Sequence, residues 1–153
     1  MAQSVETDVV AAWARAARII EFSVESALAQ VGMTPTEYEI LRALFDSCSL
    51  NVSDIGRVAV VTKSGASRAL KHMEVAGWVE RRASGTDRRA MAVSITSAGH
   101  DKFLEASEAM QPVVDKYLLD NLSPRGTREL VRFLEAVVAA GEDECDEAAA
   151  LAE

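Results

Sequence analysis

The sequence predicts a mostly α-helical fold with one small β-hairpin. Most of the chain places apolar residues at steps of three and four, which is the period of a helix, whereas residues 91–95 place them at every second position, which is the period of a half-buried strand. Turn-forming and charged residues at 84–89 separate this strand from an earlier one at 78–82. A helix followed by a basic hairpin is the winged helix-turn-helix pattern, and further helices are predicted on both sides of it.

The first predicted helix, at about residues 6–31, carries a broad apolar stripe. Ile19, Phe22 and Leu28 widen this stripe. A helix so broadly apolar needs more than one neighbour, so we expect it to pack against its own chain and against a second subunit. In a monomer it would have to be a core helix. The stripe itself consists of Val9, Trp13, Ala16, Ile20, Val24, Ala27 and Val31.

The second helix is predicted to begin directly after Thr34. Thr34 and Glu37 have the spacing of a capping box, and Pro35 takes the first helical position, where a missing N–H is tolerated. The apolar residues that follow, as far as Phe45, give this helix a core-facing side. Residues 47–50 (SCSL) are interpreted as a turn.

Two short helices joined by a tight turn are predicted next. The side chain of Asn51 can cap the first of them, and Asp54 in its first turn suits the helix dipole. Thr62 or Ser64 can cap the second, which is predicted over residues 63–76. The glycine that follows suits the left-handed conformation in which many helices end, and the hairpin begins immediately after it.

Two longer helices are predicted after the hairpin. Thr96 can cap the first, and Pro112 is expected to kink or interrupt it. Ser123, followed by a proline, opens the second, and Gly141 is expected to end it. From residue 142 the chain is acidic and rich in alanine, so we expect a frayed helix or disorder over 142–153.

The positive charge of the chain is concentrated in residues 57–90. This window holds eight Lys or Arg and three acidic residues, a net charge of +5, whereas the whole chain has a net charge of −8, so the rest carries −13. An acidic protein with one basic segment presents a defined surface to a polyanion. DNA is the expected partner, and because phosphate contacts would dominate, affinity should fall steeply with salt.

The helix at 63–76 is predicted to enter the major groove of DNA and to contact bases or phosphates. Its glycine would allow close approach of the backbone. The alternative is a solvated helix face with ordinary charges. The residues predicted to contact DNA on this recognition helix are Thr62, Lys63, Ser64, Gly65, Ser67, Arg68 and Lys71.

The tip of the hairpin is predicted to act as a wing that contacts the minor groove. An A·T-rich minor groove is narrow and attracts a guanidinium, and a neighbouring carboxylate can hold that side chain in one rotamer. We assign Arg89 to the groove, Asp87 to orienting it, and Arg88 to phosphate or groove, with Arg82 also on the wing. The alternative is an exposed loop with an ion pair worth at most about 1 kcal/mol.

We expect neither catalysis nor a cofactor. His72 and His100 have no Cys, Asp or Glu at metal-binding spacing and no nucleophile beside them, so no catalytic or metal residues are assigned. Cys48 and Cys145 lie far apart, and a redox role for Cys48 has little support from its neighbours. The chain shows no signal segment and no apolar run near the roughly 20 residues that cross a bilayer, so a cytoplasmic protein is predicted.

Three segments resemble the MarR family of transcriptional regulators. They are residues 64–68 (SGASR), 73–81 (MEVAGWVER) and above all 87–99 (DRRAMAVSITSAG), which is similar to the family's wing and the start of its next helix. The resemblance runs from Thr34 to the last helix pair. It implies a homodimer with intertwined terminal helices that binds a palindromic operator, commonly as a repressor, and often loses DNA affinity when a small anionic or aromatic compound binds.

The resemblance implies a crevice for such an effector between the helical and DNA-binding parts. Trp13 could supply an aromatic wall and Arg15, Arg42 or Arg57 a cation, as in the urate-responsive branch, although the dimer core is the favoured place for Trp13. The ligand set of zinc-responsive members and the N-terminal cysteine of peroxide-responsive members are missing, which disfavours both subtypes.

The predicted organisation is therefore a helical dimerisation region at 1–32 and 97–141, a winged helix-turn-helix DNA-binding domain at 33–96, and an acidic tail at 142–153. The predicted function is sequence-specific regulation of transcription. A competing hypothesis is a winged-helix protein-interaction module without DNA binding. The net charge of −8 favours this hypothesis, but the acidic residues avoid the wing.

Overall fold

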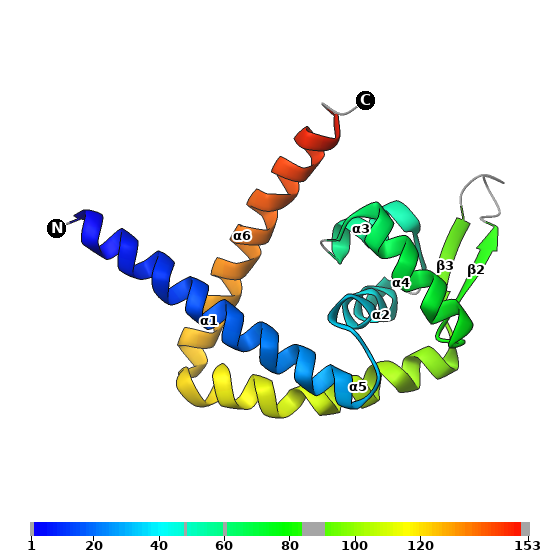
Figure 1. Cartoon of the computed structure of the whole chain (residues 1–153), viewed down its shortest axis with the longest axis horizontal. Helices are drawn as coiled ribbons and strands as arrows, with labels where there is room; N and C mark the ends of the chain where they lie inside the picture. The colour runs from blue at the N-terminus through cyan, green and yellow to red at the C-terminus, as the bar shows by residue number, and fades with distance from the viewer. Residues whose placement is uncertain (1, 48, 60, 84–90, 151–153) are drawn as a thin grey trace. The chain divides into compact units, whose positions relative to one another are not determined.

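The computed structural model describes residues 2–47, 49–59, 61–83 and 91–150 (Figure 1). Its contacts divide the chain into two units, residues 1–113 and 114–153. The elements, in chain order, are α1 (Ala2–Gln30), α2 (Pro35–Ser47), β1 (Ser49–Asn51), α3 (Val52–Val58), α4 (Lys63–Val75), β2 (Val79–Ala83), β3 (Met91–Ile95), α5 (Ser97–Tyr117), the 3-10 turn η1 (Leu119–Asn121) and α6 (Pro124–Ala150).

Hydrogen bonds at the helix starts confirm the predicted caps. The Thr34 N–H donates to Glu37 Oε2 at 2.9 Å, and the Glu37 N–H donates back to Thr34 Oγ1 at 3.3 Å, which completes the capping box of α2. Asn51 Oδ1 accepts from the Asp54 N–H at 2.9 Å at the start of α3. The caps of the later helices follow the same pattern, with Thr62, Thr96 and Ser123 accepting from the N–H three residues on.

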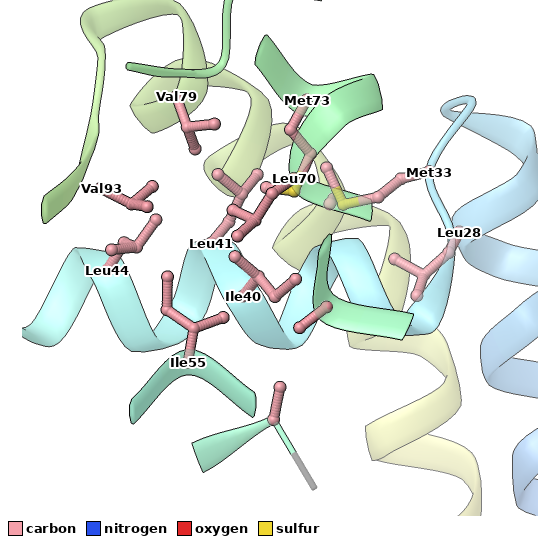
Figure 2. Close-up of a cluster of buried hydrophobic side chains, with 13 residues drawn as sticks. Leu28, Met33, Ile40, Leu41, Leu44, Ile55, Leu70, Met73, Val79 and Val93 are labelled. Atoms are coloured by element: carbon pink, nitrogen blue, oxygen red, sulfur yellow. The ribbon is translucent and has the colours of Figure 1, made fainter. Parts of the chain in front are cut away.

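The core of the first unit forms where α2 meets α3, α4 and the sheet (Figure 2). One side of α2 supplies Ile40, Leu41 and Leu44, and α4 supplies Leu70 and Met73, all with no exposed surface. Burying a side chain of this size contributes roughly 1.5–3 kcal/mol, so this contact fixes α4 against α2. The same cluster includes Ile55 from α3 and Val79 and Val93 from the sheet.

A three-stranded antiparallel sheet has the strand order β1-β3-β2. The hairpin of β2 and β3 was predicted, but β1 lies where a turn was predicted at 47–50, so that prediction is wrong from Ser49 on. The pairing of Leu50 with Val93 explains the difference. A strand this short has too few residues to show a period, and its partner lies more than forty positions along the chain.

Hydrogen bonds hold together the junction between α4, the hairpin and α5. Gly77 has φ of 74°, the left-handed conformation predicted for it. Thr96 Oγ1 donates to the carbonyl oxygen of Gly77 at 2.7 Å, and the Thr96 N–H donates to the carbonyl oxygen of Trp78 at 3.0 Å. The start of α5 is therefore held against the chain that leads into β2.

Two predicted helix breaks do not occur. α5 continues from Ser97 to Tyr117 with Pro112 inside it, so of the two effects expected of this proline, a kink or an interruption, the interruption is wrong. A proline removes one backbone hydrogen bond, which a helix of 21 residues can lose without ending. α6 likewise continues through Gly141 to Ala150, so the expected stop is wrong. Good helix formers flank this glycine, and one glycine costs only about 1 kcal/mol relative to alanine.

Each unit leaves apolar side chains exposed on a long helix. In the first unit, the buried residues of α1 over positions 7–30 are Ala27 and Leu28 near its C-terminal end, while Phe22 is 73% exposed. In the second unit, the exposed apolar residues of α6 include Val131, Leu134 and Val138. No helix in the described part of the chain has the length and apolar character required to cross a membrane.

Candidate nucleic-acid interface

The recognition helix α4 has one buried face and one exposed face. Ala66, Leu70 and Met73 are fully buried against the core. Ser67, Arg68 and Lys71 are exposed, because they alternate with the buried positions at the helical period. The exposed face therefore presents hydroxyl and cationic groups, which suit base edges and phosphates.

Thr62, one of the two residues predicted to cap α4, is the residue that caps its N-terminus. Thr62 Oγ1 accepts from the Gly65 N–H at 3.2 Å and lies 3.1 Å from Ser64 Oγ. A Cβ at position 65 would lie 3.2 Å from Thr62 Oγ1, so Gly65 makes room for the cap. The side chain of Lys63, also predicted to contact DNA, lies outside the described residues.

Several cationic side chains near the predicted interface form ion pairs with carboxylates. Arg57 pairs with Asp54 at 2.6 Å, Arg81 with Glu74 at 2.9 Å, and the wing residue Arg82 with Glu80 at 2.8 Å. The acids of two of these pairs, Glu74 and Glu80, are already counted in the net charge of +5 for residues 57–90, so only the pairing with Asp54, which lies outside that window, adds to the neutralisation. Within the described residues, no carboxylate pairs with Arg68 or Lys71, which keeps their charge available on the exposed face of α4.

The wing lies only partly within the described structure. β2 and β3 pair from Val79 opposite Ile95 to Ala83 opposite Met91. Arg82 is strongly exposed, and an exposed pair such as that with Glu80 contributes little energy, so DNA phosphates can compete for the guanidinium. The tip residues Asp87, Arg88 and Arg89 lie outside the described residues, and their assignment stays a prediction.

A contact that no sequence pattern predicts joins α4 to α2. His72 Nδ1 lies 2.6 Å from Glu37 Oε1, although the two residues are 35 positions apart. The side chain of Glu37 is 5% exposed and that of His72 is 60% exposed. No local pattern connects these residues, since Glu37 is already explained by its capping box and His72 by a polar helix face.

The four residues proposed for an effector lie on three helices. Trp13 and Arg15 lie on the exposed N-terminal half of α1. Arg42 pairs with Glu39 at 2.9 Å on α2, and Arg57 pairs with Asp54 on α3, so each makes its ion pair within its own helix. Among the described residues no group of three or more His, Cys, Asp or Glu is arranged to hold a metal ion.

A capped helix with an exposed polar face, followed by an antiparallel hairpin and preceded by a second short helix, defines a winged helix-turn-helix protein. A family model described as the MarR family matches residues 31–90. The HTH-type transcriptional repressor Rv2887 of Mycobacterium tuberculosis is 31% identical over 121 residues, which cover 79% of this chain and 86% of that protein. The chain therefore belongs to the MarR family of winged-helix transcriptional regulators.

Solved structures of this family have the same fold. Sco3205 of Streptomyces coelicolor, a MarR family transcriptional regulator in complex with DNA, matches with a TM-score of 0.82 and 24% identity over 90% of this chain and 88% of its own. AbsC, from the same organism, matches with a TM-score of 0.80 and 24% identity over 89% of this chain and 93% of its own. The winged-helix fold predicted from the sequence is thus confirmed.

Proposed function

We propose that this protein binds double-stranded DNA as a homodimer and represses transcription from a palindromic operator. The observation that carries the proposal is the exposed face of α4, where Arg68 and Lys71 have no carboxylate partner among the described residues while Leu70 between them is buried. Such a face can approach the major groove without uncovering the core. The wing would add contacts to the minor groove.

Exposed apolar surface supports the homodimer. Phe22 and Ile19 on α1 are more than half exposed in the single chain, and α6 exposes a stripe of its own. Contiguous apolar surface of this kind is typical of a protein interface. A two-fold dimer presents two copies of α4, which matches an operator made of two inverted half-sites.

Relief of repression by a small aromatic or anionic compound is the last part of the proposal. Trp13 and Arg15, both exposed on α1, offer a ring face and a cation that suit such a compound. A thermal-shift screen with small aromatic acids tests this part. A compound that raises the melting temperature and also releases the protein from its operator supports it, and a screen in which no stabilising compound releases DNA contradicts it.

Genome-wide mapping of bound DNA identifies the operator, and a mobility-shift titration then measures its affinity. Arg89→Ala is expected to weaken operator binding about tenfold, because a guanidinium in a narrow minor groove is lost. Arg125→Ala is the control, since Arg125 is exposed on α6 and pairs with Glu129 at 2.8 Å. Equal affinities of the two variants would contradict the assignment of Arg89 to the minor groove. If the wild-type protein binds no DNA fragment, the result would favour the competing hypothesis of a protein-interaction module without DNA binding.

The salt dependence of binding tests whether Lys71 contacts phosphate. Lys71→Ala is expected to weaken binding to all sequences alike and to make the slope of log K against log salt shallower by about one unit, because one fewer counterion is released. Lys116→Ala, in the last turn of α5 and outside the winged helix-turn-helix, serves as the control and should leave the slope unchanged. A Lys71→Ala variant with the wild-type slope would exclude a phosphate contact at this position.

A further inference from the structure

The carboxylate of Glu37 occupies a buried position between α2 and α4. Its Oε2 accepts from the Thr34 N–H at 2.9 Å, and its Oε1 lies 2.6 Å from His72 Nδ1. An ionised carboxylate only accepts hydrogen bonds, so Nδ1 is the ring nitrogen that carries the proton and donates. Hydrogen bonds to charged groups are stronger than neutral ones, and burial strengthens them further. One side chain thus joins the first turn of α2 to the last turns of α4.

Further contacts extend from His72 around the same region. The ring of His72 meets the ring of Trp78 edge-on, with centroids 5.8 Å apart and planes at 90°. Lys102 Nζ lies 5.6 Å from the centroid of the Trp78 ring and donates to the carbonyl oxygen of Val31. The ring of His72 is therefore in contact with both Glu37 on α2 and Trp78 at the start of the hairpin.

These contacts restrict the orientation of α4 in a way that the apolar core does not. Apolar packing of α4 on α2 holds the two helices together and fixes which face is buried, but it is non-directional and constrains the rotation of α4 less narrowly than a hydrogen bond does. A charge-assisted hydrogen bond has a narrow range of length and angle. His72 directly follows Lys71 and lies one helical turn after Arg68, so a rotation at His72 moves both cations.

We propose that the Glu37–His72 hydrogen bond sets the orientation of α4 for DNA recognition, with both residues acting as positioning residues. This inference rests on the proposed function of α4. A contact that merely stabilised the fold would change the free energy of unfolding and leave the operator affinity of the folded protein untouched. A positioning contact changes that affinity even when every variant is fully folded.

Substitutions at His72 separate these roles, because Asn and Gln place an amide nitrogen at different positions. The amide nitrogen of Asn occupies the position of Nδ1, whereas that of Gln occupies the position of Nε2. His72→Asn is expected to bind the operator within about threefold of wild type, and His72→Gln and His72→Ala about tenfold more weakly, since only Asn keeps the donor to Glu37. Gln is the better helix former, so helix propensity would produce the opposite order.

The measurement is a mobility-shift titration at a temperature where circular dichroism shows every variant folded. The same Asn and Gln pair at His100, whose ring contacts Phe45 at 4.8 Å on α2, is the matched control and should show no difference in affinity. Equal affinities of all the His72 variants and wild type would overturn the inference, and so would an equal loss in all three variants. Wild-type protein that binds no DNA would overturn the proposed function and this inference with it.

Discussion

Gly99→Ala is expected to lower the free energy of unfolding by more than about 3 kcal/mol, because the added methyl group meets backbone that cannot move away. A Cβ at position 99 would overlap the carbonyl oxygen of Trp78 and lie 2.9 Å from its carbonyl carbon and 3.0 Å from Ile95 Cγ1. The Trp78 carbonyl already accepts from the N–H of Thr96, so moving it breaks the junction between the hairpin and α5.

Chemical denaturation at one fixed protein concentration measures this effect. Gly141→Ala is the matched control, since its Cβ would meet no atom within 4 Å and the backbone there is helical. It is expected to raise stability by roughly 0.5–1 kcal/mol, as alanine replaces glycine inside a helix. A Gly99→Ala protein with the midpoint of the wild type would show that α5 can shift away from Trp78 without loss.

Local patterns predicted most of the secondary structure. The caps at Thr34, Asn51 and Thr62 involve a side chain and a backbone N–H three residues on, so the interaction is contained in the sequence. The hairpin was equally predictable, because the period of two and the intervening turn residues are both local. Helix stops were predicted less well, since a single Pro or Gly costs less than a long helix gains.

Contacts between distant residues were the part that the sequence could not supply. The strand β1 depends on pairing with β3, and the position of His72 depends on Glu37, which the chain brings close only by folding α4 onto α2. The net charge counted over residues 57–90 was limited in the same way, because the sequence does not show which cations form ion pairs. Counting residues gives Arg57 and Arg81 the same weight as Arg68, although folding pairs the first two with Asp54 and Glu74.

Leu134→Glu is expected to convert the proposed homodimer to a monomer and to weaken operator binding by about a hundredfold or more, because two linked half-site contacts bind far more tightly than one. Leu134 is 37% exposed in the single chain and lies in one stripe with Val131 and Val138 on α6. A glutamate there stays solvated in a monomer. In a dimer that covers the stripe it would be a buried, unpaired charge, which strongly opposes assembly.

Ala136→Glu separates this effect from the added charge itself. Ala136 is exposed on the same helix and, at 100° per residue, faces away from the stripe of Leu134, so its variant should remain dimeric and bind the operator as wild type does. Sedimentation velocity measures the assembly state and a mobility-shift titration measures the affinity. A dimeric Leu134→Glu protein would exclude this stripe from the interface, whereas a monomer with undiminished affinity would show that one winged helix is sufficient for the operator.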